Sequence, residues 1–241
     1  MEEKHIVSFS GGKDSTAMLL KMLEKNMRID EIIFINTQAE YPAMYEHISK
    51  VEKMINIPIT KLEFKESFEF YMLKYQKKKG EHKGESYGWC GSDCRWGTTF
   101  KKEIFKKYIK ENYSNVIIEY EGIAADEQER FSKNKDKKWT VKYPLVEWGI
   151  TEKQALKYCY KKGFDWGGLY KYLDRVSCWC CRNKNLKELK NIYKYMPEMW
   201  TRLKNLEINI GQSYKKNSSL KDLEERFKRE IYIEEHQVRM F

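Results

Sequence analysis

The first informative absence in this 241-residue sequence is that of long hydrophobic runs. No apolar run approaches the roughly 18 residues that a membrane-spanning helix requires, and the mean hydropathy is −0.79. The polar segment Met1–His5 leads directly into a strand-like apolar run, which argues against a secretory signal peptide. We therefore expect a cytoplasmic protein that does not associate with membranes.

Linkers and several common motifs are also absent. No linker divides the chain, so its length favours one α/β domain with additions. The glycine-rich segment near the N-terminus lacks the Walker spacing, because only two adjacent glycines precede its lysine. No motif that reads a nucleic-acid groove is recognisable.

The composition that is present favours a folded, basic protein. Hydrophobic residues make up 41% and aromatic residues 15% of the chain, and the net charge is +10. That charge suits an anionic polymer such as tRNA or DNA as a partner. It also suits a nucleotide enzyme with a lysine-rich surface, so charge alone does not choose between them.

The clearest chemical signal follows the first predicted strand. The apolar run Ile6–Phe9 ends in Ser10-Gly11-Gly12, and an amphipathic helix begins at once. Paired glycines let the backbone approach a ligand, while the first amides of a helix and its dipole attract anions such as phosphate. Lys13 is expected to add a positive charge, and the carboxylate of Asp14 can cap the helix or orient Mg²⁺. Hydroxyl donors are expected from Ser8, Ser10, Ser15 and Thr16.

The next elements alternate between strands and helices, which is the doubly wound α/β pattern. Strands are predicted at Glu31–Thr37, Ile59–Phe64 and Val116–Tyr120, and helices at Ala43–Asn56 and Phe100–Glu111. We expect an open, mostly parallel sheet whose ligand lies at the carboxyl ends of its strands. Polar residues follow two of these strands, and they are candidate ligand contacts: Thr37 and Glu40 after one, and Gly122, Asp126, Glu127 and Arg130 after the other.

Three segments resemble a known family. Ser10–Ser15 resembles the S-G-G-x-D-S signature of the PP-loop superfamily, and G-x-x-A-D-E-x-x-R at Gly122–Arg130 resembles the second block of its phosphoadenosine phosphosulfate (PAPS) reductase branch. Tyr143–Glu152 is similar to that branch's proline-leucine-tryptophan segment, with Thr151 as a helix cap. The resemblance covers roughly residues 4–206 and implies an adenine nucleotide alpha hydrolase-like fold that binds ATP or a related adenine nucleotide with Mg²⁺.

The expected site residues follow from the loops and the resemblance together. We expect catalysis from Lys13, Asp14, Asp126 and Arg130. We expect nucleotide binding from Ser8, Ser10, Gly11, Gly12, Lys13, Asp14, Ser15, Thr16, Thr37, Gly122 and Glu127.

The expected domains are a PP-loop domain with cysteine-rich loops at residues 1–182 and a helical C-terminal extension at residues 183–241. The extension includes a helical hairpin at Leu186–Leu206, broken at Pro197, and a charged helical tail from Tyr214 onward. These helices offer a surface for a homo-oligomer.

Six cysteines in a cytoplasmic protein favour thiols or metal ligands over disulfides. Cys159 lies in a helical pattern and is expected in the core. The pairs Cys90/Cys94 and Cys178/Cys181 can supply four thiolates to Zn²⁺ or to a [4Fe–4S] cluster, with Cys180 as a substitute in the second pair. Related sequences carry cysteine and proline where this chain has Gly97 and Arg182, so the choice between zinc and cluster stays open.

Four functions are compatible with this sequence. The preferred one is an enzyme that binds ATP, adenylates a substrate with release of pyrophosphate and serves sulfur transfer or nucleic-acid modification. A sulfur-donor protein is a candidate partner for this function. A sulfonucleotide reductase is the second, but its family places a nucleophilic cysteine on a C-terminal tail, and His236–Phe241 contains none, so Cys180 would have to serve. A nucleotide-binding module without turnover and a structural metal protein that binds nucleic acid are the others.

Overall fold

The computed structural model describes residues 2–90, 94–131 and 138–237. The chain forms two compact units. The sheet unit comprises Met1–Phe64, Lys101–Tyr170 and Arg175–Ser177, and the cysteine unit comprises Lys65–Phe100, Lys171–Asp174 and Cys178–Phe241. This division differs from the expected boundary between residues 182 and 183, because residues 65–100 group with the C-terminal helices.

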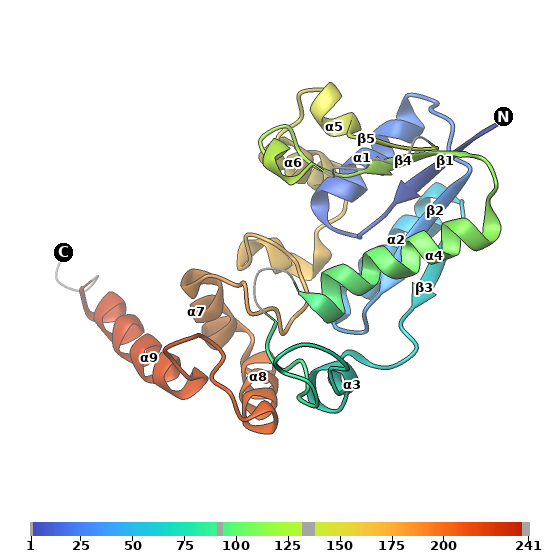
Figure 1. Cartoon of the computed structure of the whole chain (residues 1–241). Helices are drawn as coiled ribbons and strands as arrows, with labels where there is room; N and C mark the ends of the chain where they lie inside the picture. The colour runs from blue at the N-terminus through green and yellow to red at the C-terminus, as the bar shows by residue number, and fades with distance from the viewer. Residues whose placement is uncertain (1, 91–93, 132–137, 238–241) are drawn as a thin grey trace. The chain divides into compact units, whose positions relative to one another are not determined.

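The sheet unit is built on a five-stranded sheet in the order β3-β2-β1-β4-β5, with every neighbouring pair parallel. The open, parallel, doubly wound sheet predicted from the sequence is therefore confirmed (Figure 1). A short fifth strand was not expected. The strands are β1 (Glu3–Ser8), β2 (Glu31–Asn36), β3 (Ile59–Glu63), β4 (Val116–Glu121) and β5 (Trp139–Lys142).

Both faces of the sheet are covered. Ile6 and Val7 are neighbours in β1, so their side chains point to opposite faces, and both are fully buried. On the face of Ile6, the helix α4 (Phe100–Asn112) packs Phe105 and Ile109 against the strands (Figure 1). Parallel strands buried on both faces read as continuous apolar runs, which is why the sequence pattern identified most of them.

The other helices of the sheet unit are α1 (Lys13–Glu24), α2 (Pro42–Ile55), α5 (Pro144–Glu147) and α6 (Glu152–Lys161). Helix α6 begins with a capping box between Thr151 and Gln154, as the sequence predicted for Thr151. It packs against α1. Cys159 of α6 is fully buried, which confirms its expected place in the core.

The cysteine unit is helical. It contains α3 (Phe68–Leu73), a π-helical turn (Arg95–Thr99), α7 (Leu186–Tyr195), α8 (Pro197–Ile210) and α9 (Leu220–Gln237). The expected break at Pro197 is present, because Pro197 is the first residue of α8. The expected helical tail is present as α9, which buries Leu220, Leu223 and Phe227; residues 238–241 of that prediction lie outside the described residues. No helix in the described ranges has the length and hydropathy for crossing a bilayer.

Candidate functional site

The loop that joins β1 to α1 has a backbone shape that requires glycine. Gly11 has a φ of +76°, and a Cβ atom on it would lie 2.7 Å from Sδ of Met44 in α2. Gly12 precedes the first turn of α1 and provides no side-chain cap. The first amides of α1 have no acceptor within the helix, so this loop presents donors and the positive end of a helix dipole.

A second loop, after β4, is in direct contact with this helix start. A Cβ atom on Gly122 would lie 2.5 Å from Cα and 2.6 Å from N of Ser15. Only glycine allows so close an approach of two backbones. Because β1 lies between β2 and β4 and the chain winds to either side from there, this contact lies at the topological switch point, where open α/β sheets bind ligands.

The two loops enclose a cavity of about 100 Å³ in the sheet unit. Besides residues of both loops, the segment after α6 contributes to its wall. The lining residues are Ser10, Gly12, Lys13, Asp14, Ser15, Gly122, Arg130, Tyr170, Arg175 and Val176.

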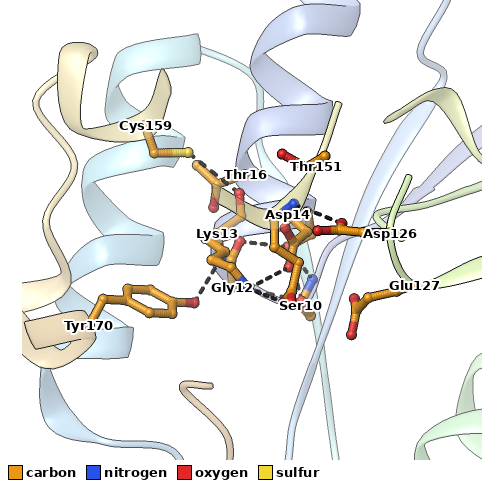
Figure 2. A network of polar contacts seen from close by, with 12 residues as sticks. Ser10, Gly12, Lys13, Asp14, Thr16, Asp126, Glu127, Thr151, Cys159 and Tyr170 are labelled. Atoms are coloured by element: carbon orange, nitrogen blue, oxygen red, sulfur yellow. Dashed lines mark hydrogen bonds and ion pairs between the residues drawn. The ribbon is translucent and has the colours of Figure 1, made fainter. Parts of the chain in front are cut away.

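Hydroxyl groups fix the shape of the first loop (Figure 2). Oγ of Ser10 lies 2.9 Å from Oγ of Ser15, and Ser15 donates to the carbonyl of Gly12 at 3.1 Å. The amide of Gly12 donates weakly to Oγ of Ser10 at 3.4 Å. The loop is therefore held in one conformation by its own side chains, so a ligand would meet a preformed surface.

The charged groups of the site form an ion-pair network. Nζ of Lys13 lies 2.5 Å from Oε1 of Glu152 and 3.1 Å from Oδ2 of Asp14, and Arg130 donates to Glu127 at 2.5 Å. One carboxylate oxygen from each of Asp14, Glu127 and Glu152 lies within 4.8 Å of the others. The network combines two cations, which suit a phosphate, with three carboxylates, which suit a divalent cation.

Burial perturbs the ionisation of two of these groups. Burial raises the pKa of Asp14 to about 6, although the ammonium of Lys13 works in the opposite direction. For Lys13, burial would lower the pKa, but Asp14 and Glu152 outweigh it and the pKa is raised. Lys13 therefore keeps its charge at neutral pH, whereas Asp14 takes up a proton in mildly acidic solution.

Three of the sequence-predicted hydroxyl contacts lie outside the cavity lining. Thr16 is fully buried and its hydroxyl lies 2.9 Å from Nε2 of His47. Thr37 is fully buried and donates to Glu40 at 3.2 Å. Ser8 hydrogen-bonds to the carboxylate of Glu119. In this structure, these hydroxyls serve the fold rather than the cavity.

Asp126 and Glu127 also differ from each other in their surroundings. Asp126 is exposed and accepts a hydrogen bond from the amide of Glu152 at 3.0 Å, so it anchors the start of α6 beside the site (Figure 2). Glu127 is buried and pairs with Arg130. Of the two, Glu127 is the one whose carboxylate faces the network of Lys13.

Sequence reasoning missed three residues of the site: Glu152, Tyr170 and Arg175. Glu152 lies directly after the predicted cap Thr151, and Tyr170 ends a glycine-rich and aromatic segment at residues 163–170. Nothing local shows that they reach a helix more than 130 residues earlier. A carboxylate at the first position of a helix is ordinarily explained by the helix dipole.

The thiols of the cysteine unit form a separate group. The amide of Gly97 donates to Sγ of Cys94 at 3.3 Å, and the amide of Cys181 donates to the carbonyl of Cys178 at 3.0 Å, forming a turn. A hydrogen bond to Cys90, together with burial, raises the pKa of Cys94, and Cys178 adds to this effect. Cys90, Cys94 and Cys178 are therefore neighbours in the folded chain, although they come from distant segments.

The turn at Cys178–Cys181 is held by the chain before α9. The hydroxyl of Tyr214 donates to the carbonyl of Cys181, and Nζ of Lys215 donates to the carbonyl of Arg182 at 2.7 Å. Cys180 is 1% exposed, and burial raises its pKa well above the ordinary value. Its thiol belongs to the core of the cysteine unit, whereas Cys178 and Cys181 are partly exposed.

Comparison with protein families decides the classification of the chain. The model of the phosphoadenosine phosphosulfate reductase domain matches residues 4–184. The chain belongs to this family. The match includes the loops after β1 and β4, the start of α6 and both cysteine pairs, so the PAPS reductase family pattern extends over both units.

Two curated relatives have no described function. They are the uncharacterized proteins MJ0066 and MJ0973 of Methanocaldococcus jannaschii, which are 26% identical over 216 residues and 27% identical over 200 residues. The alignments cover 83% and 81% of this chain but 41% and 45% of the relatives, so the chain spans less than half their length.

One similar solved structure is that of the U34-tRNA thiolase NcsA from Methanococcus maripaludis with its [4Fe–4S] cluster. It is 17% identical, with a TM-score of 0.46, and the alignment covers 95% of this chain and 71% of that one.

Proposed function

We propose that the sheet unit binds ATP or a related adenine nucleotide with its phosphates in the cavity at the ends of β1 and β4. There it activates an acceptor by adenylation and releases pyrophosphate. The observation that carries this proposal is the lining of the cavity, which joins the helix start at Gly12–Ser15 to Arg130. Amides, an ammonium and a guanidinium are the donors that recognise phosphate oxygens. Membership of the PAPS reductase family supports an adenine nucleotide as the ligand.

The residues of the network then have distinct roles. Lys13 exchanges its bond to Glu152 for a phosphate oxygen and stabilises the charge that develops on the leaving pyrophosphate. Arg130 binds a second oxygen of the phosphate chain through its planar fork. The preformed loop keeps these donors in place, so little reorganisation opposes the reaction. Asp126 supports the site indirectly by holding the start of α6.

A Mg²⁺ ion fits the carboxylates of this site. Oδ1 of Asp14 is buried without a hydrogen-bond partner among the described residues, and the carboxylates of Glu127 and Glu152 lie close by. An all-oxygen set with a nearby phosphate chain is the coordination that Mg²⁺ takes in nucleotide sites. Asp14, Glu127 and Glu152 would hold the ion, which would supply charge neutralisation to the phosphates.

The cysteine unit fits a second metal group. Cys90, Cys94, Cys178 and Cys181 would hold Zn²⁺ or a [4Fe–4S] cluster, since none of the four forms a disulfide and each is partly exposed. The turn at Cys178 and Cys181 is braced by three hydrogen bonds to carbonyls of residues 181–184, which suits a ligand loop. The group would supply either structural cross-linking or, as a cluster, electron or sulfur chemistry.

The acceptor is proposed to be a nucleic acid or a small molecule that takes up sulfur. The net charge of +10 and the exposed lysines of α4 support tRNA or DNA: Lys102, Lys106, Lys107 and Lys110. A sulfur-donor protein and assembly through the C-terminal helices belong to the same proposal. Sulfonucleotide reduction is the second candidate, because the family model carries that name. The buried thiol of Cys180 argues against it as the attacking nucleophile.

Binding and turnover of nucleotide test the proposal. Protein purified without oxygen is titrated with ATP. Pyrophosphate, AMP and sulfite are then measured after incubation with ATP, or with adenylyl sulfates together with a dithiol as the two-electron reductant. Lys13→Ala should abolish pyrophosphate release, whereas Lys53→Ala, the same change at an exposed position in the last turn of α2, should leave it intact. Nucleotide binding without any product would favour a module without turnover, and sulfite release would favour the reductase.

A further inference from the structure

The segment after α6 braces the loop that joins β1 to α1. The indole Nε1 of Trp166 donates to the carbonyl of Gly11 at 2.8 Å, and the imidazole of His47 stacks on the same indole at 4.3 Å between ring centroids. The ring of Tyr170 packs edge-on against Trp166 at 4.9 Å. Tyr170 is therefore fixed by a rigid aromatic neighbour that is itself bonded to the loop.

The hydroxyl of Tyr170 lies at the start of α1. It accepts the hydrogen bond of the Lys13 amide at 2.9 Å, and it lines the cavity together with Ser10 and Gly12 (Figure 2). Nζ of Lys13 lies 5.8 Å from the centroid of the same ring. The hydroxyl thus takes up one of the helix-start amides that a phosphate would otherwise reach.

This bond leaves the hydroxyl hydrogen available. A phenol has one hydrogen to donate, and the Lys13 amide uses only the oxygen as an acceptor. An N–H donated to the oxygen also polarises the O–H bond and makes it a stronger donor. Burial raises the pKa of Tyr170, so the group keeps its proton at neutral pH.

We propose that Tyr170 is a ligand-binding residue of this site and that its hydroxyl donates a hydrogen bond to a phosphate oxygen of the bound nucleotide. In this arrangement the Lys13 amide donates to the Tyr170 oxygen, and the Tyr170 hydroxyl in turn donates to the phosphate, so the hydroxyl relays the hydrogen bond of the helix start to the ligand. The inference rests on the proposed nucleotide site and adds to it a donor from the third wall of the cavity. The opposite arrangement is a plug, in which the hydroxyl blocks the amide and leaves when the phosphate binds.

The two arrangements predict opposite effects of Tyr170→Phe, which removes the hydroxyl and keeps the ring. A donor lost to a charged oxygen weakens binding roughly 10- to 100-fold, whereas loss of a plug strengthens it. The probes are ATP, inorganic pyrophosphate and adenosine, titrated into the full chain by calorimetry. Tyr158→Phe is the matched control, because it removes a hydroxyl that bonds to Glu24 outside the cavity.

We expect Tyr170→Phe to bind ATP and pyrophosphate at least 10-fold more weakly than the wild-type chain and to bind adenosine equally well. A merely structural role would weaken all three ligands together with the melting temperature of the free protein. Unchanged or tighter binding of pyrophosphate by Tyr170→Phe overturns the inference while the proposed nucleotide site stands. If the wild-type chain binds neither ATP nor pyrophosphate, the proposed function itself fails.

Discussion

The ammonium nitrogen of Lys13 lies 2.5 Å from Oε1 of Glu152, although 139 positions separate the two residues. This pair joins the start of α1 to the start of α6 and places a negative charge where a phosphate would bind. The charge of Lys13 is therefore paired with carboxylates of the protein itself. An anionic ligand must therefore compete with Glu152 for the ammonium of Lys13, whereas a divalent cation would be attracted by the carboxylate of Glu152.

Glu152→Gln tests this competition. Without Mg²⁺, the variant should bind ATP roughly 5-fold more tightly, because removing one nearby negative charge relieves about 1 kcal/mol of repulsion. With Mg²⁺, the gain that the ion gives the wild-type chain should shrink, since one of its three carboxylates is lost. Calorimetric titrations with and without Mg²⁺ measure both effects. An affinity that is unchanged in both conditions would contradict a role for Glu152 beside the phosphates.

The raised pKa of Asp14 makes stability depend on pH. The carboxyl of Asp14 has its ordinary pKa of 3.8 in the unfolded chain and a pKa of about 6 in the folded chain, so the folded state holds the proton more tightly. The contribution of Asp14 to stability is therefore fully present below about pH 4 and is lost as the pH rises through 6. The loss is on the order of 1–3 kcal/mol.

Asp14→Asn removes this titration, and the variant should be more stable than the wild-type chain at pH 8 but not at pH 4. Urea unfolding of both proteins between pH 4 and 8 gives the difference directly. Glu119, whose pKa burial raises to about 7, titrates in both proteins and cancels in the comparison. A stability difference that does not vary with pH would show that Asp14 is not destabilised by burial.

Gly122→Ala should damage the site through the backbone. The new methyl group would lie 2.5 Å from Cα of Ser15, an atom that cannot move without displacing α1. We expect a loss of stability of about 2–4 kcal/mol from overpacking and loss of nucleotide binding. Gly163→Ala is the control, because that glycine has open space around it and a φ of +83°, so it should cost only about 1 kcal/mol. Equal losses for both variants in urea unfolding would contradict the close contact.

Cys178→Ala and Cys180→Ala separate a ligand from a buried neighbour in the same turn. We expect Cys178→Ala to lose the bound metal and any visible absorption of a cluster, because a thiolate ligand is removed. Cys180→Ala should retain the metal with modest loss of stability, since its thiol is buried in the core. Metal analysis and absorption spectra of protein purified without oxygen provide the measurement. If only Cys180→Ala lost the metal, Cys180 would be the ligand and Cys178 would not.

The sequence predicted the fold and part of the site because those signals are local. The apolar runs of buried parallel strands are visible as such, and Gly11 and Gly12 mark a turn that few other residues could form. Strand β5 was missed because its four residues, Trp139–Lys142, include polar and charged side chains and give no buried run. A short strand at the sheet edge leaves only a weak pattern.

The sequence did not predict which way individual side chains point. Thr16 and Thr37 carry hydroxyls at positions next to a loop, but the sequence does not show whether each turns toward the cavity or into the core. The partner of Thr16 is His47, which comes from α2, and the partner of Thr37 is Glu40, three residues further along the same loop. Conversely, nothing in the sequence indicated that the side chains of Glu152 and Tyr170 reach the site. Their local patterns have ordinary explanations, and only tertiary packing brings them to Lys13.

The backbone contact between Gly122 and Ser15 sets a boundary on how this cavity can change. At this point main chain lies against main chain, so no substitution at Gly122 can reshape the cavity without displacing the start of α1. Variation in ligand preference among related proteins should therefore be concentrated in side chains away from that contact, at Arg130 of the loop after β4 and at Tyr170 and Arg175 of the segment after α6. Redesign of the site for a bulkier ligand should begin with those three side chains.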